Sequence, residues 1–419
     1  MVTDAFEGVR ILDFTQLEQG PSATQMLADF GADVIKVERI DVGEIGRNQA
    51  PFLGDGYSPH WSATNRNKRS ISVDVKSPEG RKLILDLARN ADIVASNFRP
   101  GVMDRLGLGY EDLSAVNPRI IVAYASGYGL SGPYTHRRGQ DLAAQAISGL
   151  MALSGTEDAG PMPTGTFMID YVASMQFALG MMAALAARER TGRGQVVDSN
   201  LMNAAITTHL QEGTTFLSTG QRYPRPPANI AHAHNTALYG YYQAADGLWF
   251  ALIGEYYVDE QWRRAARACG LTPEQTDDPR FQSIEGLREH VHETRDLLAE
   301  AIARFPRDEI MARFEAEDVL VAPVHDYDAV FEDPQVRHNN LVLEADVAGV
   351  GPVRFVGMPI SLSETPARLR MVPPKVGQHN EEVLRAAGLS PEEIANLKSA
   401  GVIGSESDRE AAGGRPAWS

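Results

Sequence analysis

The sequence predicts an α/β fold in which helices cover a parallel sheet. Two observations support this prediction. The first 130 residues alternate short apolar segments of strand length with segments of helix length, and hydrophobic residues make up 43% of the 419 residues, which is ample for buried cores. Strands that alternate with helices are typical of parallel sheets, because the crossover between two parallel strands is usually a helix.

Local signals support each element of this first part. Pro21 stands near the first turn of one predicted helix and Gly31 lies past its end, whereas Ser77 is an N-cap candidate and Pro78 takes the first helical position of another. The predicted strands cover residues 8–15, 32–39, 91–98 and 119–127, and the predicted helices cover residues 21–31 and 77–90. We therefore expect a Rossmann-like sheet.

A change of character near residue 220 indicates a domain boundary. Three prolines fall within the first seven residues of 221–235, which suits an extended linker. We expect the N-terminal part of a large domain over 1–224, a smaller α/β domain over 225–330, and a C-terminal part over 331–419. The tail from about 404 is polar and contains glycine, so we expect it to be disordered.

The composition excludes several classes of function. The formal net charge is −16, from 55 acidic and 39 basic residues, and such a surface repels nucleic acid and anionic membranes on average. Cys269 is the single cysteine, so neither an internal disulfide nor a cysteine-based metal site is expected. No run approaches the roughly 18 uncharged apolar residues of a membrane span, and the first residues lack the features of a secretory signal. We expect a cytoplasmic protein.

Three common functional patterns are weak. GYGLSG at 127–132 matches the glycine fingerprint of dinucleotide sites, but the residues that follow, PYTHRRG, do not form the helix that the fingerprint requires. The histidines at 232 and 234, and those at 290 and 292, have no acidic partner at ligand spacing, which favours loop histidines over a metal site. The serine of ASGYG (125–129) does not stand in a nucleophile elbow.

One carboxylate precedes the most apolar helix of the chain. In GTFMIDYVASMQFALGMMAALAARER (165–190), Asp170 stands directly before about five turns of apolar and small residues. Aspartate is a favoured N-cap, and the pattern alone favours this structural role over catalysis. The two roles are compatible, because the N–H groups that satisfy a cap would also hold the carboxylate ionised, and such a carboxylate can be a nucleophile.

Several longer motifs together indicate a family. The chain resembles the class III (CaiB/BaiF-type) CoA-transferases, which include formyl-CoA:oxalate CoA-transferases and, as a side branch, the α-methylacyl-CoA racemases. The resemblance covers nearly the whole length, with the motifs GVRILDFT…LADFGADVIKVER, NKRSISVDVKSPEG, SNFRPGVMDRLGL, YGLSGPY, PTGTFMIDY…RERTGRGQVVDSNL and KVGQHNEEVLRAAGLSPEEIANL. It implies a large Rossmann-like domain with a parallel sheet built from both chain ends, a smaller α/β domain and an interlocked homodimer.

The resemblance also implies a reaction. In transferases of this kind the aspartate before the small-residue helix is the nucleophile, and Asp170 occupies that position here. Its carboxylate attacks an acyl-CoA thioester to give a mixed anhydride, the CoA thiolate returns to give an aspartyl-CoA thioester, and an acceptor carboxylate reverses the exchange. The expected partners are acyl-CoA and a small carboxylic acid, without metal or redox cofactor.

An acidic protein must gather cations for CoA, which carries a pyrophosphate and a 3′-phosphate. The resemblance implies CoA contacts from basic residues and their neighbours, namely Gln19, Arg39, Val73, Asp74, Val75, Lys76, Asn97, Phe98, Arg99, Arg105, Arg137 and Arg138. For Arg99 an ordinary surface charge is an equally good interpretation.

Two positions depart from the formyl-CoA branch of this family. Glu18 stands where that branch has a glutamine that steadies intermediates, and NIAHAHNTALYG (229–240) replaces a run of glycines that forms a mobile flap. A bulkier or differently charged acid is therefore at least as good an expectation as formate or oxalate. We expect Glu18 and Gln140 as further catalytic residues. Which of Glu18, His232, His234 and Tyr256 faces the acyl group stays open.

Two other functions stay open beside the transferase. The racemases of this family use a histidine in a Gly-His-Asp context, where this chain has Gly139, Gln140 and Asp141. A glutamine amide cannot exchange a proton near neutral pH, so a two-base mechanism lacks one member and the transferase is favoured. The third interpretation is a CoA-ester binding protein without activity, against which the presence of Asp170 speaks.

Overall fold

The computed structural model describes residues 4–40, 42–54, 56–254 and 260–405. The chain divides into two compact units. Unit 1 consists of Met1–Ser148, Thr166–Thr208 and Pro334–Ser419, and unit 2 consists of Gly149–Gly165 and His209–Asp333. The expected boundary at 224/225 falls inside unit 2, and the tail expected to be disordered lies outside the described residues except for its start.

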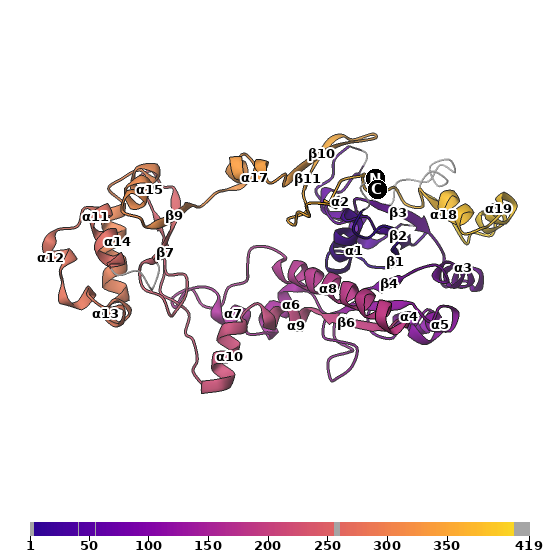
Figure 1. Ribbon diagram of the computed structural model, residues 1–419, viewed down its shortest axis with the longest axis horizontal. Helices are drawn as coiled ribbons and strands as arrows, with labels where there is room; N and C mark the ends of the chain where they lie inside the picture. The colour runs from indigo at the N-terminus through magenta and orange to yellow at the C-terminus, as the bar shows by residue number, and fades with distance from the viewer. Residues whose placement is uncertain (1–3, 41, 55, 255–259, 406–419) are drawn as a thin grey trace. The chain divides into compact units, whose positions relative to one another are not determined.

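Unit 1 is built on a six-stranded parallel sheet with the strand order β3-β2-β1-β4-β5-β6 (Figure 1). The strands are β1 (Arg10–Asp13), β2 (Asp33–Glu38), β3 (Lys68–Ser72), β4 (Ile93–Ser96), β5 (Ile121–Ser126) and β6 (Val196–Asn200). The central strands are buried on both faces, as their continuous runs of valine and isoleucine require. This strand order is that of the Rossmann fold, which confirms the predicted α/β class.

Helices cover both faces of this sheet. Successive strand residues point to opposite faces, so Ile11 packs on one face and Leu12 on the other. Helices α1 (Gln19–Asp29) and α8 (Met168–Thr191) pack on the face of Ile11, where Phe177 and Met181 of α8 are fully buried. The opposite face is covered by α3 (Pro78–Ala88), α5 (Tyr110–Val116), α18 (Asn380–Ala386) and α19 (Pro391–Ser399).

The C-terminal part returns to unit 1 without adding a strand to the parallel sheet. All six strands of that sheet lie between Arg10 and Asn200, so the expectation of a sheet built from both chain ends is wrong. Two strands of this part, β10 (Val342–Val347) and β11 (Gly351–Val356), pair with each other as an antiparallel hairpin, which satisfies their backbone groups locally. Only a single bridge, Val73 to Ile403, joins this part to the end of β3.

Short helices complete unit 1. They are η1 (Ile45–Asn48), α2 (Pro59–Ser62), α4 (Val102–Arg105), α6 (Asp141–Ile147), α9 (Leu201–Thr207) and α17 (Pro334–His338). The predicted cap of α3 is confirmed, because the Ser77 hydroxyl accepts the N–H of Gly80 at 3.0 Å. No helix follows the glycines of GYGLSG until α6 begins at Asp141, so this stretch lacks the geometry of a dinucleotide site.

Unit 2 has a core of its own around a three-stranded antiparallel sheet. Its strands are β7 (Tyr239–Gln243), β8 (Trp249–Ile253) and β9 (Leu320–Pro323). Tyr242, Phe250 and Phe314 are fully buried between this sheet and helices. The helices are α7 (Leu150–Leu153), α10 (Leu210–Thr219), α11 (Gln261–Cys269), α12 (Pro273–Thr276), η2 (Pro279–Phe281), α13 (Ile284–Glu289), α14 (Val291–Ile302), α15 (Arg307–Ala316) and α16 (Tyr327–Val330).

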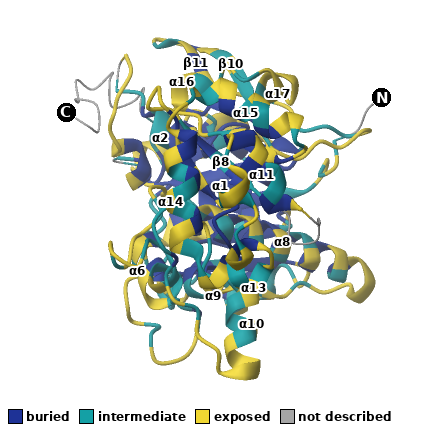
Figure 2. Cartoon of the chain, turned by 90° about the vertical axis from the view of Figure 1, so that its left-hand side faces the viewer, coloured by how far each residue is buried: buried dark blue, intermediate teal, exposed yellow. Residues whose placement is uncertain are grey.

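Two helices carry much exposed apolar surface. α8 is long and apolar enough, by length and composition alone, to cross a membrane, contrary to the expectation that no run approaches a membrane span. A core helix passes the same test, and α8 packs on the sheet through Ala173, Phe177 and Met181. α10 has no buried residue at all, and Figure 2 shows it in yellow and teal.

Candidate active site

The loop after β1 is held by side chains from the neighbouring strands. The Lys36 ammonium donates a hydrogen bond to the Thr15 carbonyl at 2.8 Å. Asn97, which follows β4, binds both backbone groups of Gln16: its Oδ1 accepts the N–H at 2.8 Å and its Nδ2 donates to the carbonyl at 2.7 Å. β1 and β4 are the adjacent strands at which the strand order reverses, and ligands of open α/β sheets bind at that point.

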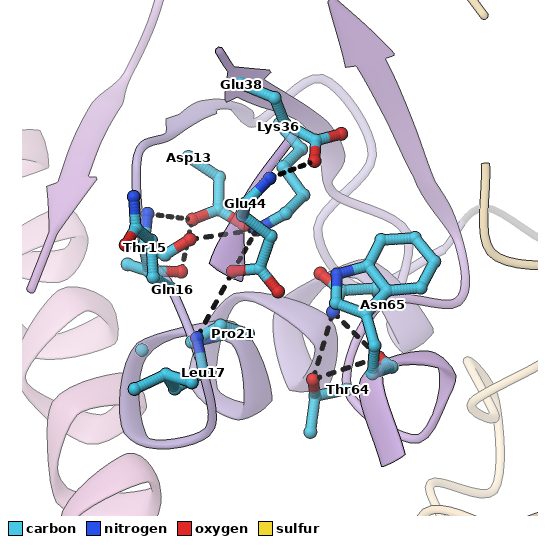
Figure 3. A network of polar contacts seen from close by, with 12 residues as sticks. Asp13, Thr15, Gln16, Leu17, Pro21, Lys36, Glu38, Glu44, Thr64 and Asn65 are labelled. Atoms are coloured by element: carbon cyan, nitrogen blue, oxygen red, sulfur yellow. Dashed lines mark hydrogen bonds and ion pairs between the residues drawn. The ribbon is translucent and has the colours of Figure 1, made fainter. Parts of the chain in front are cut away.

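The same loop then leads into Glu18. The N–H of Leu17 donates to Oε2 of Glu44 at 3.2 Å, and the same oxygen lies 3.4 Å from the Lys36 ammonium (Figure 3). Leu17 has φ of 65°, a left-handed conformation that is uncommon for residues other than glycine and persists where the surroundings enforce it. The buried Lys36–Glu44 pair therefore holds the backbone directly before Glu18.

Further buried ion pairs lie beneath this loop. Asp13 pairs with Lys68 at 3.0 Å, and Glu38 pairs with Arg47 at 2.7 Å. Burial alone would raise the pKa of Asp13, but Lys68 and Lys36 beside it hold that pKa below its usual range. Burial likewise opposes ionisation of Glu38, yet Arg47 lowers its pKa to about 2. Each charge is compensated, whereas the loss of one partner would leave an uncompensated buried charge.

Asp141, the first residue of α6, caps the N-terminus of α8. Its Oδ2 accepts the N–H of Ile169 at 2.6 Å and the N–H of Asp170 at 3.0 Å. Its other oxygen accepts the side-chain amide of Gln145. The expectation that Asp170 is the cap is therefore wrong: another carboxylate, distant in sequence, takes the N–H groups that the helix leaves unpaired.

Asp170 is the third residue of α8, and its carboxylate lies among other acids. Over the parts of the chain that are described, no group donates a hydrogen bond to it. Burial, together with the nearby carboxylates of Glu18 and Asp141, raises the pKa of Asp170 to about 7. The expectation that helix N–H groups hold Asp170 ionised is wrong for the same reason as the cap, since Asp141 occupies them.

Glu18 lies between the loop and α1, next to a histidine. Burial raises the pKa of Glu18 to about 7, with a further contribution from Asp141. Nε2 of His60, in α2, is 3.9 Å from Oε2 of Glu18, which is too far for a hydrogen bond. Nδ1 of His60 is buried and has no hydrogen-bond partner among the described residues.

Two glycines bring Asp141 back to the end of β5. Gly127 follows β5 and Gly139 precedes Gln140, and the two backbones touch: a Cβ on Gly139 would lie 2.3 Å from the Cα of Gly127. Only glycine fits at either position. This contact closes the loop between them, so that Gln140, which is exposed, and Asp141 lie at the carboxyl end of the sheet.

The residues expected to contact CoA follow the carboxyl ends of five neighbouring strands. Gln19 comes after β1, Arg39 directly follows β2, Val73–Lys76 directly follow β3, and Asn97–Arg99 directly follow β4. Beyond β5 lies the segment of Arg137 and Arg138, and Arg105 is the last residue of α4. The basic side chains of this set are exposed, and the Arg137 guanidinium lies over the Tyr134 ring at 3.9 Å.

Comparison with known proteins places this geometry in a family. The family model described as CoA-transferase family III matches residues 6–380. The chain belongs to CoA-transferase family III. One sequence relative is an acyl-CoA transferase of Fusarium pseudograminearum, which is 35% identical over 95% of this chain and 88% of the relative. Another is a succinyl-CoA:glutarate CoA-transferase of Mus musculus, which is 35% identical over 90% of this chain and 85% of the relative. A formyl-CoA:oxalate CoA-transferase of Streptomyces coelicolor is 34% identical, with 96% and 100% covered.

Solved structures agree with this assignment. A CaiB/BaiF family protein from Brucella suis superposes with a TM-score of 0.81 at 29% identity, covering 92% of this chain and 99% of that one. A hypothetical protein from Mycobacterium tuberculosis gives a TM-score of 0.78 at 28% identity, covering 91% and 100%. The relatives named above are CoA-transferases, so this member of family III is an enzyme of the transferase class.

Within this CoA-transferase, three of the residues expected to contact CoA make other hydrogen bonds. Both ends of the Asn97 amide bind Gln16, so Asn97 positions the loop before Glu18. The N–H groups of Val73 and Asp74 donate to the carbonyls of Glu38 and Val402 at 2.9 and 2.8 Å. Any contact of this backbone with CoA therefore uses carbonyl or side-chain atoms instead of these two amides.

Of the other candidates for facing the acyl group, two belong to unit 2 and the third is not among the described residues. His232 and His234 belong to unit 2, where Nε2 of His232 lies 3.1 Å from Oε1 of Glu212 and Nδ1 of His232 accepts the N–H of His234 at 3.1 Å. Tyr256 lies outside the described residues.

Sequence reasoning missed Asp141 as the cap and His60 as the neighbour of Glu18. His60 stands in the short helix α2, which carries no recognised motif, and Asp141 is 29 residues from Asp170. Within the described ranges, no group of three or more acidic, histidine or cysteine side chains is arranged to hold a metal ion, although three carboxylates interact here.

Proposed function

We propose that this CoA-transferase moves CoA from an acyl-CoA thioester to a free carboxylic acid, with the Asp170 carboxylate as nucleophile. The observation that carries this proposal is the state of Asp170. It lies at the carboxyl end of the sheet with no described hydrogen bond to its carboxylate, so its oxygens are free to react. A nucleophilic carboxylate needs this freedom, because a hydrogen bond to it would lower its reactivity.

The reaction follows from carboxylate and thioester chemistry. One Asp170 oxygen forms a bond to the thioester carbonyl carbon, the C–S bond breaks, and the electron pair leaves with the CoA sulfur. The thiolate then attacks the Asp170 carbonyl of the mixed anhydride and releases the donor acid as a carboxylate. An acceptor carboxylate repeats both steps in reverse, and protons are neither consumed nor released overall.

The CoA moiety is proposed to lie along the carboxyl ends of β2 to β5. Arg39, Lys76, Arg105, Arg137 and Arg138 supply exposed positive charge there in a chain of net charge −16. Phosphates are bound by such clusters through charge-assisted hydrogen bonds. Gln19, Phe98 and Arg99 are proposed to complete the contacts, with Asn97 acting through the loop that it holds.

The acids exchanged are proposed to be small carboxylic acids. Relatives are named for succinyl-CoA and glutarate, for succinyl-CoA and D-citramalate, and for formyl-CoA and oxalate. Three carboxyl groups surround the reacting position, so an anionic acid approaches against repulsion unless the site holds a proton. Glu18 and Gln140 are proposed to contact the reacting groups.

A homodimer is proposed as the active form, in the cytoplasm. The α8 stripe, which consists of Tyr171, Met175 and Leu179, repeats every four residues and is 40%, 42% and 61% exposed. α10 exposes Leu210 and Leu217. Apolar surface of this extent on one chain is typical of surfaces that a second copy covers.

The test is acyl transfer by Asp170→Ala. We expect transfer from succinyl-CoA to a panel of free acids to be abolished, while CoA binding, measured by calorimetry, changes little. The exposed Asp328 gives the matched control Asp328→Ala, which should transfer normally. Turnover by Asp170→Ala above a few per cent of wild type would overturn the proposal. If the wild-type protein exchanges an α-proton with heavy water without transferring CoA, it is a racemase. If it shows neither activity, it is a binding protein.

A further inference from the structure

The carboxyl groups of Glu18, Asp141 and Asp170 cannot all have the same protonation state. Asp141 accepts two backbone N–H groups and one side-chain amide, and such donors stabilise the charged form of a carboxylate. A negative charge on Asp141 therefore has donors of its own, which Asp170 and Glu18 lack among the described residues. Any proton that the cluster holds belongs to Asp170 or to Glu18.

Glu18 has little compensation for a negative charge. Over the described parts of the chain, no group donates a hydrogen bond to its carboxylate, and its side chain is only 23% exposed. His60 is the one basic group within 4 Å, but the separation of 3.9 Å is not a hydrogen bond. The buried Nδ1 of His60 has no acceptor that a second imidazole proton would need.

The loop fixes where this carboxyl group lies. Lys36 and Glu44 hold Leu17, Asn97 holds Gln16, and α1 begins directly after Glu18. The backbone at Glu18 therefore cannot shift without breaking these bonds. Its proximity to Asp141 and Asp170 is a built feature of the site.

We propose that Glu18 works as a neutral carboxylic acid, which donates its O–H to the oxyanion that forms on the carbonyl carbon under attack by Asp170. This inference rests on the proposed function of Asp170. The Glu18 proton stays on Glu18 throughout: the Asp170 O–C bond forms, the C–S bond breaks with its electron pair on sulfur, and the hydrogen bond strengthens only while the carbonyl oxygen is negative.

A neutral Glu18 serves the reaction in a second way. The entering acid carries a negative charge, and an ionised Glu18 beside Asp141 and Asp170 would repel it. With Glu18 protonated, the cluster holds one charge fewer whenever Asp170 is ionised. The charged groups that interact with Glu18 are Asp141 from α6, Asp170 from α8 and His60 from α2. Burial raises the pKa of both Glu18 and Asp170 to about 7, so the pair titrates together near neutral pH.

The experiment compares Glu18→Gln, which keeps a hydrogen-bond donor but cannot ionise, with Glu18→Ala, which has no donor. The measured quantity is the single-turnover rate of CoA transfer from succinyl-CoA onto Asp170, trapped with hydroxylamine, from pH 5.5 to 9. We expect the wild-type rate to fall on the alkaline side, where Glu18 loses its proton. Glu18→Gln should be about threefold to tenfold slower at the optimum and lack that alkaline fall, and Glu18→Ala should be about 100-fold slower.

Two results would overturn this role of Glu18. One is a Glu18→Gln variant as slow as Glu18→Ala, which would mean that an ionised carboxylate is required. The other is an alkaline fall that Glu18→Gln retains. Glu111→Gln, an exposed carboxylate on α5, controls for the loss of one negative charge and should behave as wild type. A failure of the proposed function is distinguishable, because wild type would then form no adduct on Asp170.

Discussion

The pKa of Asp170 is raised in a site where another carboxylate accepts the nearby N–H groups. A carboxylate in the first turn of a helix is normally stabilised by the N–H groups there. Here Asp141 accepts the N–H groups of Ile169 and Asp170, so Asp170 gains the burial but not the donors. The result is a carboxyl group that is ready to react and costly to ionise.

This raised pKa predicts a pH-dependent stability. The pKa of Asp170 rises from its ordinary value of about 3.8 to about 7 on folding, so folding binds a proton between these values. The free energy of unfolding should therefore fall as pH rises through that interval. Asp170→Asn cannot ionise, and we expect it to raise the midpoint of thermal unfolding by a few degrees at pH 8 and by much less at pH 4.

The control for this measurement is Asp328→Asn, which changes an exposed carboxylate in α16. It should change the midpoint of thermal unfolding only slightly, and by the same amount at pH 4 and pH 8. A gain for Asp170→Asn that is the same at pH 4 and pH 8 would show that packing, and not ionisation, is responsible.

At the residue level, the sequence singles out Asp170 but does not predict its surroundings. The apolar helix after Asp170 and the longer motifs around it are continuous in sequence, so both could be recognised. Asp141 and His60 reach the site through the folding of β5 and α2, and no spacing in the sequence records that approach. The donors that Asp141 takes decide the state of Asp170, so an expectation drawn from the helix N-terminus alone has the wrong sign for its pKa shift.

Helix α8 has two faces with different roles. Its inner face packs Ala173, Phe177 and Met181 on the sheet, whereas the α8 stripe stays exposed. An ordinary surface helix carries polar residues on its outer face. The apolar outer face favours the proposed homodimer, and it explains why α8 resembles a membrane span in composition.

We predict that Leu179→Asp disrupts the proposed dimer. Leu179 is the most exposed member of the α8 stripe, and a buried, unpaired charge at an interface is strongly unfavourable. Sedimentation analysis should give a dimer for wild type and a shift to monomer for the variant. Val356→Asp is the control on the exposed side of β11 and should stay dimeric. A wild-type chain that sediments as a monomer would contradict the proposal.

The predicted elements differ in how well they match the structure. The N-terminal strands and helices carry local caps and apolar runs, and β1, α1, β2, α3, β4 and β5 fall within or close to the predicted ranges. The C-terminal strand candidates have equally good propensity, but strand propensity does not specify a partner. β10 and β11 lie only a few residues apart, so they pair with each other instead of extending the large sheet.

In the whole molecule, each compact unit is built from segments that are not continuous in sequence. Unit 1 takes three separate parts of the chain, and unit 2 takes the short segment Gly149–Gly165 together with His209–Asp333. Prolines near 224 indicated a boundary, yet proline marks an extended segment and not the limit of a core. The candidate site itself lies within unit 1, on residues between Glu18 and Asp170.

The central claim is that Asp170 becomes covalently attached during transfer, and peptide mass spectrometry tests it most directly. Wild-type protein is incubated with succinyl-CoA, treated with hydroxylamine and digested. We predict a hydroxamate on Asp170 that requires succinyl-CoA and is absent from Asp170→Ala. A hydroxamate on Glu18 or Asp141 instead, or none on any residue while the enzyme turns over succinyl-CoA, would contradict the account.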